Sequence, residues 1–194
     1  MKKLILIALV CTQMINAQDS KDTIFAEIMN RKNEVRVDVL SLILSSKINL
    51  TYERFLNKDF SAGVAFGMIS HDEANDDFDR GYRNYLPKYE INPYVRYNLS
   101  KSQVHFYFAE VFLSANGGEY KEIVRLTDAD GNGYYATEKS KYTDFGIGAG
   151  LGYKIYIKDK IPMEIMVGFG TNLFNKEKSP DTLNRVGLSV GYRF

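Results

Sequence analysis

The 194-residue chain has 25 lysines and arginines against 24 aspartates and glutamates, a formal net charge of +1, so no positive surplus argues for a nucleic-acid partner. Its single cysteine excludes a fold held by disulfides within the chain. Fourteen tyrosines, twelve phenylalanines and fifteen glycines suit a sheet protein with aromatic bands and a crowded interior.

The amino terminus has the pattern of a secretory signal peptide. Lys2 and Lys3 precede an apolar run from residue 4 to 11, which is too short to span a bilayer. Ala17 is followed by a polar segment, and we expect cleavage after it, so that residues 1–17 are removed on Sec-dependent export.

Cys11 raises the alternative of a lipoprotein. The residue before it is Val10, where a lipoprotein signal normally has a small residue, so an ordinary apolar segment is preferred. Residues 18–33 are expected to precede the folded domain, with a short helix at 25–31.

Eight segments then alternate apolar and polar residues, the period-2 pattern of a strand with one face in an apolar medium. Each is close to the ~10 residues of a tilted membrane strand. The expected strands are 34–44, 47–55, 60–69, 88–98, 103–114, 142–157, 162–173 and 184–194.

The strand at 142–157 shows the two faces most clearly. Its outward face is apolar, and its other face consists mainly of glycine, which would be a poor water-exposed surface and a poor core. Glycine suits a narrow lumen where side chains from other strands approach the backbone closely. These glycines are Gly146, Gly148, Gly150 and Gly152.

Short and long connections alternate along the chain. The short ones are 56–59, 99–102 and 158–161, and the long polar ones are 70–87, 115–141 and 174–183. Bacterial barrels have short periplasmic turns and long external loops. We therefore predict an all-β, eight-stranded antiparallel up-and-down transmembrane β-barrel over residues 34–194, with residues 18–33 in the periplasm. A soluble lipocalin-like barrel matches the strand count but gives no reason for this alternation.

Two details of the strands are also predicted. Pro93 lacks a backbone donor, so a bulge is expected there. Turning Glu110 inward on the strand at 103–114 also turns Phe106, Phe108 and Phe112 inward and His105 outward.

Charged residues on the inward face form the candidate site. Facing lipid would cost ~2–4 kcal/mol for an Arg or Lys at the bilayer midplane, so these side chains are expected in the lumen. Five acids and five bases favour mutual pairing in a filled lumen, with Glu53 and Glu90 as partners of Arg96; a conducting or proton-relaying path is the alternative. The ten residues are Arg36, Asp38, Glu53, Glu90, Arg96, Glu110, Lys154, Glu164, Arg185 and Arg193.

Three runs, 48–55, 60–64 and 91–97, resemble strands of small, mostly uncharacterised outer-membrane β-barrel proteins of Bacteroidota-type bacteria. The resemblance covers essentially the whole chain after the signal peptide. It implies an OmpA-like barrel without the periplasmic peptidoglycan-binding domain. It also implies assembly by the barrel-insertion machinery, for which Tyr192 and Phe194 match the recognised last-strand signal.

A possible calcium site lies in the long connection 115–141. Asp128, Asp130, Asn132 and Gly133 match the first positions of an EF-hand loop, but the position of the bidentate glutamate is Lys139. A hairpin tip is the alternative, since Asn-Gly is a favoured turn dipeptide. We expect no metal and no cofactor.

The remaining candidate chemistry is weak. Acidic residues of the first long loop could contact cations that bridge lipopolysaccharide, or could simply be solvated. His105 and Ser102 are the nearest histidine–serine pair, but they lie at the periplasmic end, away from the outer rim where lipid-modifying barrels act. We expect a monomeric outer-membrane barrel, not an enzyme, with a structural or surface-interaction role through its external loops. A narrow pore and a lipid-modifying enzyme are the alternatives.

Overall fold

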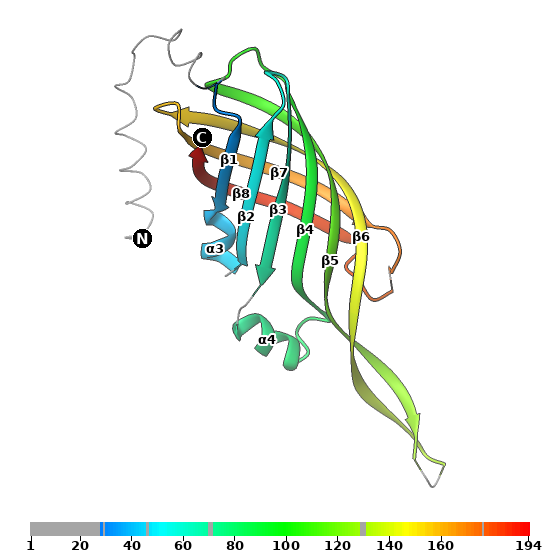
Figure 1. Ribbon diagram of the computed structural model, residues 1–194. Coiled ribbons are helices and arrows are strands. Elements are labelled where there is room, and N and C mark those ends of the chain that lie inside the picture. Colours follow the sequence, from blue (N-terminus) through cyan, green and yellow to red (C-terminus); the bar gives the residue numbers. More distant parts are fainter. Residues whose placement is uncertain (1–27, 29, 46, 70–71, 129–130, 176) are drawn as a thin grey trace.

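The computed structural model describes residues 28, 30–45, 47–69, 72–128, 131–175 and 177–194 and shows a closed antiparallel barrel in which each strand pairs with the next and β8 pairs with β1 (Figure 1). The predicted fold class is confirmed. The strands are β1 (Asn33–Asp38), β2 (Lys47–Phe55), β3 (Phe60–Ile69), β4 (Tyr85–Asn98), β5 (His105–Thr127), β6 (Gly133–Ile157), β7 (Ile161–Asn172) and β8 (Thr182–Arg193). The helices are α3 (Val39–Ser45) and α4 (Asp72–Asp79). No helix in the described part of the chain is both long and apolar enough to cross a membrane.

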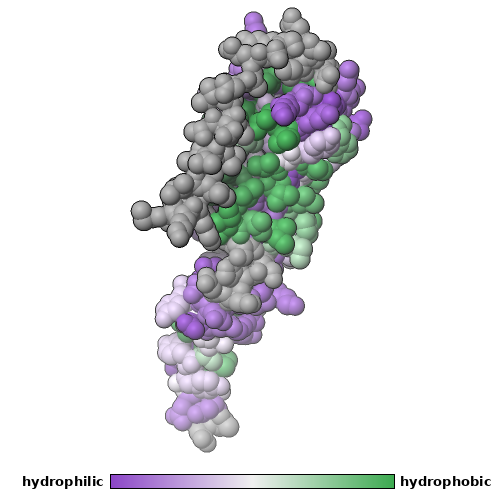
Figure 2. Space-filling model, turned by 90° about the vertical axis from the view of Figure 1, so that its left-hand side faces the viewer, coloured by the Kyte–Doolittle hydropathy of each residue, from purple (hydrophilic) through white to green (hydrophobic). Residues whose placement is uncertain are grey.

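The barrel has two unlike ends. The short-turn end carries the β2–β3, β4–β5 and β6–β7 turns and the carboxyl terminus; the long-loop end carries α3, α4 and a protruding β5–β6 hairpin (Figure 1). Large apolar side chains are exposed around the wall between the ends, and on the face seen in Figure 2 they form an apolar area between two polar regions.

The strand expected at 34–44 is wrong in its second half. β1 ends at Asp38, and Val39–Ser45 is helical. Asp38 Oδ1 accepts the backbone N–H groups of Leu40 (3.0 Å) and Ser41 (3.2 Å), which is the geometry of a helix N-cap. A run that is apolar except for Ser41 is ambiguous between strand and helix, and the cap at Asp38 decides for the helix.

The long connection expected at 115–141 is also wrong, because most of it is sheet. β5 and β6 stay paired from Asn116–Asp144 out to Thr127–Gly133. From Glu122 on β5 and up to Ser140 on β6, residues on both faces are exposed or half-buried, so this part lacks the apolar alternation that identifies a membrane strand. The connection expected at 70–87 contains α4, and β4 starts at Tyr85.

The bulge expected at Pro93 is wrong as well. Pro93 pairs with Val64, and the β4–β5 register is the same on both sides of it. The sheet tolerates the missing backbone N–H of Pro93 because the residue pairs on both sides of it keep the same register. The register shift lies instead between Pro87 and Tyr89. On β5, Glu110 and its three phenylalanines are buried and His105 is exposed.

Candidate functional site

The lumen holds an ammonium group among three carboxylates in its short-turn half. Lys154 Nζ on β6 lies 2.7 Å from Glu34, 2.9 Å from Glu53 and 3.2 Å from Glu164. All four side chains are at most 2% exposed. Period-2 alternation on β1, β2, β6 and β7 turns them all to the same interior.

Two guanidinium groups complete this arrangement, which we call the charge cluster: Glu34, Arg36, Glu53, Arg96, Lys154 and Glu164. Arg96 donates from Nη1 to Glu164 at 2.7 Å and to Glu53 at 3.0 Å. Arg36 pairs with Glu34 and Glu53, and its Nε lies 3.5 Å from Glu164. Each buried charge therefore meets at least two opposite charges, which offsets the cost of removing it from water.

Glu110 and Arg185 extend the charge cluster toward the long-loop end. Arg96 Nε donates to Glu110 at 2.6 Å, and Arg185 pairs with the other Glu110 oxygen. Arg185 also lies over the Phe112 ring, 4.7 Å from its centroid. This is a charged contact on an aromatic face inside the barrel.

Arg193 lies apart, at the short-turn end. Its guanidinium is 3.6 Å from the Phe55 ring centroid and donates to the Tyr156 hydroxyl at 2.8 Å. Tyr156 in turn donates to Glu34. Arg193 is thus linked to the charge cluster through a hydroxyl.

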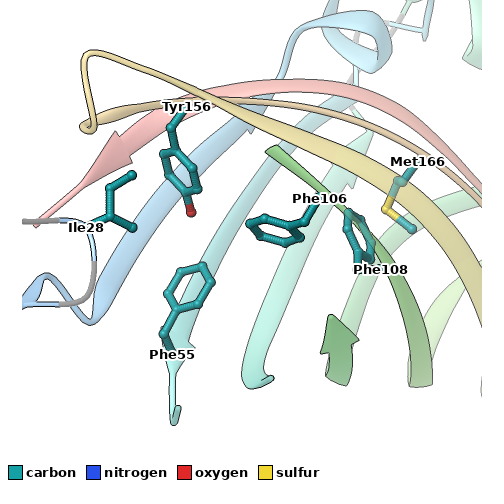
Figure 3. Close-up of a cluster of buried hydrophobic side chains, with 6 residues drawn as sticks. All are labelled: Ile28, Phe55, Phe106, Phe108, Tyr156 and Met166. Carbon is teal, nitrogen blue, oxygen red and sulfur yellow. The ribbon is translucent and has the colours of Figure 1, made fainter. Parts of the chain in front are cut away.

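A hydrophobic cluster closes the short-turn end beneath the charges (Figure 3). Ile28 is fully buried in it, although it precedes β1 and belongs to no strand. Arg31 forms an ion pair with Asp159 in the β6–β7 turn. This contact holds the described residues before β1 against the short-turn end of the barrel. The members of the cluster are Ile28, Phe55, Phe106, Phe108, Tyr156 and Met166. Residues 18–27 and residue 29, where most of the expected periplasmic segment and helix fall, lie outside the described residues, as does the signal peptide.

The glycine face of β6 makes room for phenylalanine rings from β5. A Cβ on Gly148 would overlap the Phe112 ring, and one on Gly152 would overlap the Phe108 ring. The glycines therefore let two large rings fill the lumen from the neighbouring strand.

Asp38 and Glu90 belong to a different region, a cavity of about 200 Å³ at the long-loop end that we call the vestibule. Glu90 pairs with Lys47 at 2.6 Å, so its expected pairing with Arg96 is wrong; the Glu53–Arg96 pair is present. The vestibule is lined by Asp38, Ser41, Lys47, Asn49, Thr51, Glu90, Arg96, Glu164, Met166, Asn184, Arg185, Val186, Gly187 and Ser189.

The three carboxylates of the charge cluster have the separation of a metal site, with ligand oxygens within 4.8 Å of one another. Lys154 Nζ donates to Glu34 and Glu53 and forms an ion pair with Glu164, so an ammonium group supplies the positive charge that a cation would bring. The donor set therefore fits a lysine better than a metal.

The sequence reasoning missed Glu34 and Lys47. Both stand at strand ends, and counting back by twos from Arg36 and from Asn49 would have turned them inward.

The other candidates have structural roles. Asp128 Oδ1 accepts the Asn132 backbone N–H at 2.8 Å and closes the hairpin tip, and Asp130 lies outside the described residues. Ser102 Oγ accepts the backbone N–H groups of Val104 and His105 at 3.3 Å each, as a turn residue does.

Outside the barrel, α4 is fastened to the base of the protruding hairpin. Lys121 donates to the last carbonyls of α4, at Phe78 and, at 3.0 Å, Asp79. Lys139, its cross-strand neighbour, pairs with Asp79 at 2.6 Å. That contact lowers the pKa of the Asp79 carboxyl, because the Lys139 ammonium stabilises the charged form.

Aromatic residues gather on the outer surface near the short-turn end. Tyr192 and Phe194 are about half exposed and their rings are stacked, with centroids 6.5 Å apart. Tyr107 on β5 and Tyr153 on β6 form a second pair, with ring centroids 4.7 Å apart. Aromatic bands at this level mark a membrane–water interface in transmembrane barrels.

Comparison with known proteins gives a family and a fold. A family model described as "Protein of unknown function (DUF3575)" matches residues 4–184. The structure is similar to the N-terminal β-barrel domain of Pseudomonas aeruginosa OprF, with a TM-score of 0.50 and 13% identity over 84% of this chain and 98% of that chain. It is equally similar to Neisserial surface protein A, with a TM-score of 0.50 and 12% identity over 84% of this chain and 95% of that chain. No match was found among curated proteins.

Proposed function

The chain belongs to the DUF3575 family of proteins of unknown function, and on that premise we propose that it is an integral outer-membrane β-barrel with a lumen plugged by side chains. The protein then has a structural or surface-interaction role at the cell surface, through α4 and the β5–β6 hairpin.

The observation that carries this proposal is an inverted pattern of burial. Arg36 and Lys154 are at most 2% exposed, whereas Leu151 and Phe169 on the outer wall are 58% and 62% exposed. Apolar side chains on the outside of a barrel are favourable when the surrounding medium is lipid. The two similar solved barrels support the same location through their fold.

The orientation follows from the two ends of the barrel. The short-turn end faces the periplasm with residues 18–33, after Sec export and removal of residues 1–17. Tyr192 and Phe194 serve as the signal for the barrel-insertion machinery. The barrel is monomeric, and its surroundings are membrane lipid and lipopolysaccharide.

Heat-modifiability tests the location. The unboiled protein in SDS is expected to migrate differently from the boiled protein and to fractionate with the outer membrane. A protein released by mild washing, with no shift on boiling, would sink the membrane proposal and leave a soluble lipocalin-like binder.

A second experiment separates the surface role from a pore. Planar bilayers are expected to show no conductance that depends on Arg96 or Glu53, because both are fully engaged in the charge cluster. Replacing residues 119–141 by a short turn is expected to alter adhesion or envelope integrity while the heat-modifiable band persists. Conductance lost on Arg96→Ala would favour the pore.

A further inference from the structure

The short-turn end carries exposed cations all around its mouth. They come from the residues before β1, from the end of β2 and from each of the three short turns (Figure 1). The acidic side chains in these turns are Asp59 and Asp159, and Asp159 already pairs with Arg31. Within the described part of the chain none of the exposed cations forms an ion pair, so the protein leaves their charge unbalanced. We call these residues the basic rim: Lys32, Arg54, Lys58, Lys101, Lys158 and Lys160.

Each short turn also exposes a large apolar side chain close to its lysine. Leu56 is 58% exposed and stands two residues before Lys58. Leu99 is 55% exposed and stands two residues before Lys101. In the third turn Ile161, 39% exposed, directly follows a lysine. At the surface of a membrane such an apolar side chain enters the acyl boundary while the lysine extends to the head groups.

A lipid surface fits this pattern better than a soluble polyanion does. A soluble polyanion needs cations gathered on one face, and it gains nothing from exposed leucines. The basic rim instead follows a closed ring at the edge of the apolar wall, and the aromatic pair Tyr192 and Phe194 lies on that wall at the same end. Lipids surround such a ring on all sides, so that each turn meets its own head group.

We propose that the basic rim binds phospholipids whose head group has a net negative charge, in the membrane leaflet that the short-turn end faces. The lipid phosphate accepts N–H groups from a rim lysine, and the acyl chain packs against the apolar residue of the same turn. A zwitterionic head group carries its own cation beside the phosphate and leaves the charge of the rim unbalanced. The inference rests on the proposed membrane location.

The chain contains no tryptophan, so a single introduced one reports on its own position. Leu99→Trp places it beside Lys101, and Leu113→Trp places it on the outer wall of β5, nearer the long-loop end, as a reference. Each variant is reconstituted in phosphatidylcholine vesicles that hold a small fraction of brominated phosphatidylglycerol or brominated phosphatidylcholine. Quenching in L99W should favour phosphatidylglycerol roughly fivefold, the ratio that about 1 kcal/mol per lysine near an anionic surface gives, and quenching in L113W should favour neither.

Second substitutions in L99W connect this preference to the basic rim. Lys101→Gln should remove most of it, and Lys101→Arg, which keeps the charge, should retain it. Lys141→Gln makes the same chemical change on an exposed lysine near the long-loop end and should have no effect. A higher salt concentration should lower the preference, because exposed charges are screened. Heat-modifiability verifies that each variant is folded.

Several results would overturn the proposal. Equal quenching by the two lipids in L99W is one, and a preference that survives Lys101→Gln or is equally strong in L113W is another. Absence of quenching in both L99W and L113W would overturn the membrane location, and this proposal with it. If soluble polyglutamate removed the preference in L99W while total quenching stayed the same, a soluble polyanion would be the occupant of the basic rim and the assignment to lipid would fail.

Discussion

Lys154 and Glu34 stand 120 positions apart in the chain and meet at 2.7 Å inside the barrel, with neither side chain exposed. One lies near the carboxyl end of β6 and the other near the start of β1. Their contact crosses the lumen, so it forms only when the barrel is closed.

Lys154→Met should destabilise the barrel strongly. The substitution keeps the length of the side chain and removes the charge that lies among three buried carboxylates. Removing one partner of a buried ion pair costs about 3–5 kcal/mol of stability. Urea unfolding in lipid vesicles would measure the decrease in the free energy of unfolding. Lys101→Met, on an exposed short turn, is the control and should change the unfolding free energy by less than about 0.5 kcal/mol. Equal midpoints for the two variants would contradict the role of Lys154.

Gly148→Ala should cost about 1–3 kcal/mol through overpacking, because the new methyl group would overlap the Phe112 ring and the Phe169 carbonyl. Gly168→Ala is the matched control on β7. The nearest atom to its methyl group is the Ala149 carbonyl oxygen at 3.1 Å, so a smaller cost is expected. Thermal unfolding, followed by the heat-modifiable band, would rank the stabilities of the two variants. A Gly168→Ala variant less stable than Gly148→Ala would contradict this explanation of the glycine face.

Asp38→Ala should destabilise the first turn of α3 and its connection to β8. Asp38 Oδ1 accepts the N–H groups of Leu40 and Ser41 and also that of Leu188 on β8, at 3.2 Å. Loss of a helix cap costs about 1 kcal/mol. Hydrogen exchange should accelerate at these three amides and remain unchanged in Asp38→Asn, which keeps the acceptor. Acceleration spread evenly over the barrel would instead mean general destabilisation.

The contact between α4 and the hairpin should weaken in acid. The pKa of Asp79 is lower in the folded protein than in the unfolded chain, so its contribution to stability is present above the unfolded pKa, near about 4. It is lost as the pH falls through the lower folded pKa. NMR shifts of α4 amides would follow the change, and Asp79→Asn should remove this dependence. A transition unchanged in that variant would assign it to another group.

The alternation of side chains allowed the closed barrel and the inward position of most lumen charges to be predicted, because an apolar outer face and a charged lumen place opposite polarity on successive residues. α3 could not be separated from a strand, since residues 39–44 are apolar except for Ser41 and show no clear period. The outer part of the hairpin, beyond Lys121, was missed because both of its faces are exposed and its sequence therefore lacks the alternation of apolar and polar residues.

Pairing partners inside the lumen were harder to predict than orientation. Glu90 and Arg96 both turn inward on β4, but Glu90 meets Lys47 and Arg96 meets Glu53 and Glu164. Which side chains meet depends on their height along the barrel, and that height is set by the stagger between strands. Period-2 alternation contains no information about stagger.

The contact of Arg193 with the residues before β1 joins the last strand to the part of the chain that fills the short-turn end. Arg193 Nε donates to the Arg31 carbonyl at 2.8 Å, and Ile28 enters the hydrophobic cluster three residues earlier. The last strand thus helps to hold in place the described residues before β1, of which Ile28 fills part of the short-turn end. Because this hydrogen bond needs β8 beside β1, the filling of the short-turn end by Ile28 depends on closure of the barrel.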